Sequence, residues 1–311
     1  MPPPLLLRDV TLRDGLQDER PVPIEGKLAI YDALVLAGVS ELELTSFVRP
    51  DRVPAMADAE ELARRTSDRA GPGSPVRWAL VLNPTGAERA LAAGLDHLQF
   101  VVSVSDAHSL ENSGRPTAQA LDELDGLVAL ALSREAVVEV TLSTAFGCPF
   151  TGPVAPDEVL SVVSRALAAG VSGIGLADTI GTAVPSEARS LTAATVAVAG
   201  GVPVGIHLHD TRGLAVANAL AALDAGAVRV DGALGGLGGC PFAPGASGNL
   251  ALEDLAHGLE AMGTPTGLDV DGLVRAAALA CELVGREVGS HVGRAGKRFS
   301  NTPYASSKEG E

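Results

Sequence analysis

The chain has 311 residues, of which 46% are hydrophobic and 20% are charged, so it can bury a sizeable core and disorder is excluded. Asp and Glu number 38 against 23 Lys and Arg, which gives a formal net charge of −15. Such a surface repels a phosphate backbone, and aromatic residues make up only 3%, so nucleic-acid binding is excluded as the main function.

Membrane and secretory segments are not expected. No apolar run reaches the roughly 20 residues that a membrane-spanning helix needs, and no basic segment precedes the first leucines. The three cysteines, Cys148, Cys240 and Cys281, are odd in number and too widely spaced for a disulfide framework. These features favour a cytoplasmic protein without a membrane partner.

Short β-branched runs alternate along the chain with Ala- and Leu-rich stretches of helical period. The predicted strands cover residues 5–13, 40–45, 76–82, 97–102, 137–143, 172–177, 204–209 and 229–233. The predicted helices cover residues 24–37, 54–65, 84–93, 118–133, 156–169, 186–199, 214–225 and 249–262.

Eight strand–helix units in about 260 residues are typical of the α/β class and of a (β/α)8 TIM barrel in particular. An open, doubly wound parallel sheet is the alternative, because alternation alone does not close a barrel. An extra helix is predicted over residues 270–284. We therefore expect a barrel domain over residues 1–288, followed over 289–311 by a polar, flexible C-terminal tail.

Polar residues gather where the predicted strands end, which is where TIM barrels carry their functional groups. His207 and His209 end the seventh strand, and alternate residues of a strand face the same side, so both imidazoles should point into the barrel mouth. With the carboxylate of Asp14 and one further oxygen they would form a mixed nitrogen and oxygen set that suits Mg, Mn, Zn or Fe(II). The alternative is that both histidines are polar residues satisfied within the barrel.

Three more charged residues are candidates for the same site. Arg13 precedes Asp14 at the end of the first predicted strand, and its permanent charge suits the stabilisation of an oxyanion. The alternative is a solvated turn pair of little energetic value. Glu43 and Asp178 are carboxylates in mostly apolar strands, where buried carboxylates need partners. They either hold Arg13 and the histidines in place or form salt bridges at the barrel rim.

A Gly- and Pro-rich segment, residues 235–248, follows the eighth strand and is predicted to be a loop. Over a barrel mouth, such a loop can act as a lid that excludes water. Cys240 in this loop is a candidate proton donor, because the pKa of a thiol is about 8.5 and the group therefore carries a proton at neutral pH. The alternative is an incidental cysteine in a flexible linker. Asn249, at the start of the next predicted helix, would ordinarily be a helix cap.

Several motifs occur together in one order along the chain. They are RDGLQ at 13–17, ELTSF at 43–47 with VPAMAD at 53–58, GCPF at 147–150, DTIG at 178–181, HLHDT at 207–211 and the Gly-rich segment 236–249. In this the chain resembles the 3-hydroxy-3-methylglutaryl-CoA lyase family of the DRE-TIM metallolyases. The Gly-rich loop with its cysteine is the most specific motif, because the condensing relatives share the metal site but not this loop.

The resemblance implies a ligand set for a divalent cation, Mg or Mn, that consists of Asp14, His207, His209 and Asn249. The implied reaction is a retro-Claisen cleavage of 3-hydroxy-3-methylglutaryl-CoA to acetoacetate and acetyl-CoA, as in leucine breakdown. His207 or Asp14 would take the proton of the tertiary hydroxyl, whose pKa the metal lowers. An acyl-CoA substrate and a homodimer are the implied partners.

The resemblance also implies roles for the remaining candidates. Arg13 would stabilise the enolate oxygen of the departing acetyl-CoA, and Cys240 would act as a general acid or proton shuttle. Glu43 and Asp178 would support the site.

Two departures from the family pattern concern the substrate. Thr11-Leu12 stands before Arg13 where the family usually has Gly-Pro, a form similar to isopropylmalate, homocitrate and citramalate synthases. The sequence SFVRPDR at 46–52 replaces a common Ser-Pro-Lys-Trp. The alternatives are therefore an acetyl-CoA-condensing synthase or a lyase for a different branched 3-hydroxyacyl-CoA. Cys240 and the lack of a regulatory domain after the barrel speak against the synthase.

Overall fold

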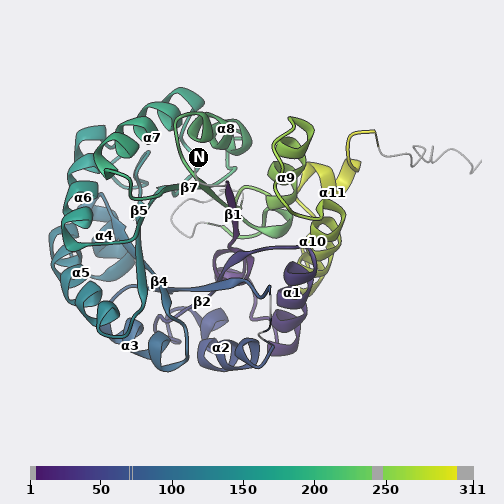
Figure 1. The fold of residues 1–311 in the computed structure, drawn as a ribbon, viewed down its shortest axis with the longest axis horizontal. Coiled ribbons are helices and arrows are strands. Elements are labelled where there is room, and N and C mark those ends of the chain that lie inside the picture. The colour runs from purple at the N-terminus through teal and green to yellow at the C-terminus, as the bar shows by residue number, and fades with distance from the viewer. Residues whose placement is uncertain (1–4, 70, 72, 240–247, 300–311) are drawn as a thin grey trace, which may run out of the picture.

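The computed structural model describes residues 5–69, 71, 73–239 and 248–299. Eight parallel strands form a closed barrel in chain order, with the last strand paired to the first (Figure 1). They are β1 Leu6–Asp9, β2 Glu41–Ser46, β3 Val76–Val81, β4 His97–Ser103, β5 Val137–Ser143, β6 Gly173–Asp178, β7 Val204–Leu208 and β8 Arg229–Gly232. The predicted TIM barrel is confirmed, and the open sheet is excluded.

Helices surround the barrel and cover the outer faces of its strands (Figure 1). Ile30 and Leu34 of the first helix and Leu42 and Leu44 of β2 belong to one core and are 0% exposed, as expected for parallel strands covered by helices. The helices are α1 Ile24–Leu36, α2 Ala59–Ser67, α3 Pro84–Ala92, α4 Asp106–Ser113, α5 Thr117–Leu132, α6 Pro156–Ala169, α7 Pro185–Ala199, α8 Ala215–Asp224, α9 Leu252–Ala261, α10 Val270–Val284 and α11 His291–Ala295.

Some predicted boundaries are wrong. The first strand ends at Asp9 rather than at residue 13, because the Asp9 carboxylate accepts hydrogen bonds from the backbone N–H and the hydroxyl of Thr11, at 2.9 and 2.8 Å. The chain then turns into a short π-helix, η1 Thr11–Gly15. The predicted helix 54–65 is a 3-10 turn, η2 Pro54–Met56, followed by α2. The helix α4 was not predicted, and α9 begins three residues later than expected.

The inside of the barrel carries charged side chains. Arg8 of β1 donates hydrogen bonds to Glu139 of β5, at 2.9 Å, and to Glu41 of β2, at 2.7 Å. Arg229 of β8 pairs with the same Glu139. Because β5 is a neighbour of neither β1 nor β8, these contacts cross the interior of the barrel.

In the described part of the chain after β8, the helices α9, α10 and α11 lie on one side of the barrel (Figure 1). The predicted helix 270–284 is confirmed as α10. The segment from residue 289, predicted to be a flexible tail, instead contains α11, whose Val292 is buried and whose first N–H groups bond to Asp254 near the start of α9. Residues 300–311 of that tail lie outside the described residues. None of the helices in the described part combines the length and apolar character needed to cross a bilayer.

Candidate active site

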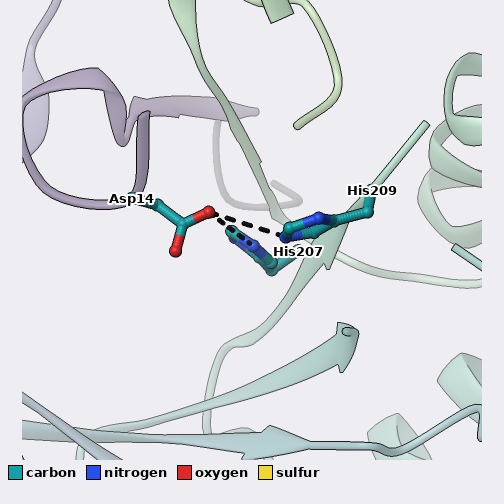
Figure 2. Close-up of side chains that lie close together, drawn as sticks. All are labelled: Asp14, His207 and His209. Atoms are coloured by element: carbon teal, nitrogen blue, oxygen red, sulfur yellow. Dashed lines mark ion pairs between the residues drawn. The ribbon is translucent and has the colours of Figure 1, made fainter. Parts of the chain in front are cut away.

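Three side chains converge at the mouth of the barrel: Asp14, His207 and His209 (Figure 2). The Oδ2 atom of Asp14 lies 3.8 Å from Nε2 of His207 and 3.5 Å from Nε2 of His209. Each histidine is 6% exposed, and the two ring centroids are 5.3 Å apart. Among the described residues, this is the only group of three His, Cys, Asp or Glu side chains spaced to hold a metal ion.

The local backbone explains how these residues meet. The N–H of Gly15 donates to the carbonyl of Val10 at 3.0 Å, which closes the π-helical turn that carries Asp14. Turns of this kind are frequent at functional sites. His207 lies in β7 and His209 directly follows it, so the two imidazoles share one side of the strand as predicted.

The charges around Asp14 favour its ionised form. Burial alone would raise the pKa of Asp14, but the adjacent Arg13 guanidinium and the two imidazoles outweigh burial and hold that pKa well below its usual value. Burial would lower the pKa of His207, but hydrogen bonding to Asp231 and the charge of Asp14 raise it. The cluster therefore combines an ionised carboxylate with the His207 imidazole, whose proton competes with any bound cation.

The spacing of the cluster fits a divalent cation. The two Asp14–imidazole distances are too long for good hydrogen bonds. Ligand atoms that each lie about 2.1 Å from one ion are separated by at most roughly 4 Å, so both Asp14–imidazole distances match those between ligands of one ion. Nδ1 of His209 is buried and has no hydrogen-bond partner among the described residues, so the nearest charged partner of this side chain is Asp14.

Asn249 lies beside Asp14, as its predicted role requires, although it caps no helix. Its backbone pairs with His209 in an isolated bridge, and α9 begins only at Leu252. The amide Nδ2 donates to Oδ2 of Asp14 at 2.7 Å and to the Leu237 carbonyl at 2.9 Å. The amide oxygen is buried and has no hydrogen-bond partner in the described structure.

Arg13 and Glu43 form a buried pair next to the cluster. Nε of Arg13 donates to Glu43, and Nη1 of Arg13 donates to Asp14. The side chains of Arg13 and Asp14 are 8% and 12% exposed, so these two residues are not the solvated turn pair considered as an alternative. Glu43 orients Arg13 toward the cluster, which matches the supporting position expected for it.

Asp178 is placed differently from expectation. Its two carboxylate oxygens accept hydrogen bonds from the backbone N–H groups of Thr182, at 2.9 Å, and Ala183, at 3.0 Å. Burial raises the pKa of Asp178, although these hydrogen bonds oppose the rise. The carboxylate thus shapes the loop after β6, and no hydrogen bond joins it to Arg13, His207 or His209 among the described residues.

The described ends of the predicted lid segment are anchored to the barrel. The N–H of Gly235 donates to Glu253 at 2.9 Å, and its carbonyl accepts from the N–H of Gly289 at 3.0 Å. The Gly248 carbonyl accepts from the N–H of Asp210 at 3.0 Å. Cys240, the candidate proton donor, lies outside the described residues.

Two buried residues next to the cluster were missed by the sequence analysis. Arg229 and Asp231 lie in β8, are 4% and 1% exposed, and bond to each other at 2.9 Å. Oδ2 of Asp231 lies 3.5 Å from Nδ1 of His207. The signal was available, because charged residues at alternate positions of a buried strand must face the barrel interior together.

Comparisons with known proteins identify the family to which the chain is similar. The model of the family described as HMGL-like matches residues 5–280. The chain is 40% identical to (R)-citramalyl-CoA lyase of Chloroflexus aurantiacus, over 96% of this chain and 98% of that protein. It is 36% identical to a hydroxymethylglutaryl-CoA lyase of Bacillus subtilis, over 93% and 96%. The structure of an HMG-CoA lyase from Acinetobacter baumannii in complex with coenzyme A and 3-methylmalate superimposes with a TM-score of 0.91, at 36% identity over 96% and 97% of the two chains.

Proposed function

The chain belongs to the HMGL-like family, and from this premise we propose that it is a divalent-metal-dependent carbon–carbon lyase that cleaves a branched 3-hydroxyacyl-CoA to acetyl-CoA and an oxo acid. The observation that carries the proposal is the convergence of Asp14, His207 and His209 at the carboxyl ends of the strands. An ionised carboxylate and two imidazoles in a buried position are a ligand set for a catalytic cation.

We propose Asp14, His207 and His209 as ligands, with Asn249 as the fourth and with Mg or Mn as the cation. In this structure the amide nitrogen of Asn249 donates a hydrogen bond to Asp14, while its buried amide oxygen has no hydrogen-bond partner among the described residues. A cation between the two side chains would favour the opposite orientation of the amide. When bound, the cation would polarise the hydroxyl and carboxylate oxygens of the substrate.

Side chains of the protein itself carry out the remaining steps of the proposed reaction. One of two bases, Asp14 or His207, takes the proton of the tertiary hydroxyl, and that oxygen becomes a carbonyl as the bond between C2 and C3 breaks. The electron pair of this bond passes to the thioester, whose enolate oxygen is stabilised by Arg13 in the orientation that Glu43 imposes. Cys240 protonates C2 to give acetyl-CoA, and the proton held by the base restores the thiol. Asp178 supports the site through its loop.

3-Hydroxy-3-methylglutaryl-CoA is the proposed substrate, with acetoacetate as the second product. Citramalyl-CoA is a second candidate, because a relative of that activity is 40% identical over 96% of this chain. It lacks one methylene between carboxylate and carbinol carbon, and the same bond cleavage would give pyruvate. The segment 46–52, which departs from the family pattern, is where we expect the two substrates to be distinguished. A homodimer, a cytoplasmic location and a role in leucine breakdown remain predictions.

The test is to incubate the purified protein with each acyl-CoA and Mg²⁺ or Mn²⁺, with and without a chelator. Acetyl-CoA, acetoacetate and pyruvate are measured separately, and His209→Ala is the matched inactive control. We expect metal-dependent release of acetyl-CoA with one of the two oxo acids. Release of neither, with metal shown to be bound, would refute the proposed reaction for both substrates.

A further inference from the structure

The strand β8 contributes two charged residues to the inside of the barrel, directly beside β7. Arg229 is in register with Gly205, and Asp231 is in register with His207. Both charged side chains are almost completely buried, at 4% and 1% exposure. A charge in such a position needs a specific partner to offset its lost hydration.

The two oxygens of Asp231 have different partners. Oδ1 accepts from Nε of Arg229 at 2.9 Å. Oδ2 faces Nδ1 of His207 at 3.5 Å. Among the described residues, neither Nδ1 nor Oδ2 has a standard hydrogen-bond partner, so each is the polar neighbour available to the other. On the opposite edge of the ring, Nε2 of His207 faces Asp14.

We propose that Asp231, anchored by Arg229, is a positioning residue that keeps the proton of His207 on Nδ1 and so leaves Nε2 free to bind a cation together with Asp14. Because both ring nitrogens of His207 are then occupied, this arrangement assigns the role of base to Asp14 and not to His207. The inference rests on the proposed function, because it presumes that the cluster holds a metal ion. A histidine that donates its second ring N–H to a carboxylate has a fixed tautomer and ring orientation. His209 has no such partner on Nδ1 among the described residues, so the effect is specific to one ligand.

The anchor of Asp231 is itself fixed by packing. Arg229 pairs with Glu139, which also accepts from Arg8. The guanidinium fits only because β7 has no side chain there: a Cβ at Gly205 would lie 2.6 Å from Cζ of Arg229. At Gly175 of β6, a Cβ would lie 3.0 Å from Nη2 of the same residue. The position of the Asp231 carboxylate is therefore set by the barrel interior and not by solvent.

The substitution Asp231→Asn tests the tautomer directly. Nε–H of Arg229 still requires an acceptor, so the single amide oxygen of the asparagine turns toward it. The NH₂ group then faces Nδ1 of His207, which must accept, and the ring proton moves to Nε2. An imidazole protonated on Nε2 cannot bind a cation through that atom.

The experiment measures the Mn²⁺ dissociation constant by electron paramagnetic resonance for the wild type, for Asp231→Asn and for Glu139→Gln. The last variant is the matched control, because it removes a carboxylate from the same interior cluster without touching His207. We expect Asp231→Asn to raise the dissociation constant roughly 10- to 100-fold and Glu139→Gln to leave it near the wild-type value. In the Mg²⁺-loaded wild type, ¹⁵N NMR should place the ring proton of His207 on Nδ1.

The outcomes distinguish a failure of the proposed function from a failure of the role proposed for Asp231. A wild-type protein that binds no Mn²⁺ would refute the proposed function and this inference with it. Wild-type binding that Asp231→Asn leaves unchanged would overturn the role of Asp231 alone, and so would equal weakening in Glu139→Gln. If Asp231→Asn does not fold, the NMR measurement decides, because a proton on Nε2 of His207 in the Mg²⁺-loaded protein contradicts the inference.

Discussion

Glu253 should make the stability of this barrel depend on pH in an unusual direction. The residue lies in the first turn of α9, is 0% exposed, and accepts a hydrogen bond from the N–H of Gly235. Burial raises the pKa of its carboxyl from 4.5 to about 7, although its hydrogen bonds oppose the rise. The folded protein therefore holds this proton more tightly than the unfolded chain does.

The sign and size of the effect follow from this difference. Between about pH 4.5 and pH 7 Glu253 is more protonated in the folded than in the unfolded state, so its contribution to the free energy of unfolding falls as the pH rises and is constant above that range. The two pKa values differ by an amount that corresponds to about 3 kcal/mol. Glu253→Gln keeps an oxygen for Gly235 and removes the charge. We expect the variant to gain up to about 3 kcal/mol relative to the wild type between about pH 4.5 and pH 8.

The assay is urea unfolding followed by circular dichroism at both pH values, with Glu282→Gln, at an exposed position of α10, as the control for loss of a charge. Burial also raises the pKa of Asp9 to about 7, and the charge of Glu253 adds to that rise, so the difference between the two proteins includes the loss of this smaller coupling. A stability difference between Glu253→Gln and the wild type that is equal at the two pH values would refute the reasoning.

Three further predictions concern the site. His209→Ala should weaken Mn²⁺ binding by more than the roughly 100-fold that loss of an outer partner costs, as measured by calorimetry, and unchanged affinity would contradict the ligand assignment. Cys240→Ser should lower kcat roughly 100-fold or more while metal content stays at the wild-type value, and loss of metal in that variant would refute a role as proton donor alone. Glu43→Gln should lower kcat by up to roughly 100-fold through displacement of Arg13, with Mn²⁺ affinity retained; a full kcat would show that Arg13 needs no such support.

The fold could be predicted because its signals are local and repeated. Eight apolar strand segments alternating with helical periods predict a parallel α/β fold and favour a barrel by their number, whereas closure itself is seen only in the structure. The errors occur where a single side-chain contact determines where a helix or strand begins or ends. The strand β1 stops early because Asp9 bonds to Thr11, and α11 is held by Asp254, 37 residues away from His291. Contacts of that kind leave no periodic trace in the sequence.

The site could be predicted in part for the same reason. His207 and His209 are two residues apart at the end of one strand, and functional groups of such barrels lie where strands end. These two facts were enough to predict that both histidines lie close to Asp14, as the structure shows. The position of Asn249 depends on a backbone bridge to His209 that no helix or strand pattern contains. The alternation of Arg229 and Asp231 on one strand could have placed Asp231 inside the barrel, but its contact with His207 depends on the register between β7 and β8, which the sequence does not state.

The charged side chains inside the barrel are better explained by a role in positioning His207 than by a contribution to the stability of the fold. A buried ion pair rarely stabilises a protein more than apolar residues of the same volume would, because desolvation offsets the attraction. This chain nevertheless places Arg8, Glu139, Arg229 and Asp231 inside the barrel, and Gly205 leaves the space that Arg229 fills. The cluster reaches the candidate metal ligands through the contact between Asp231 and His207. If its purpose is to fix that contact, the effect of a substitution on metal affinity must decrease with distance along the chain of contacts, from Asp231 to Arg229 to Glu139 to Arg8, whereas the loss of stability need not follow that order.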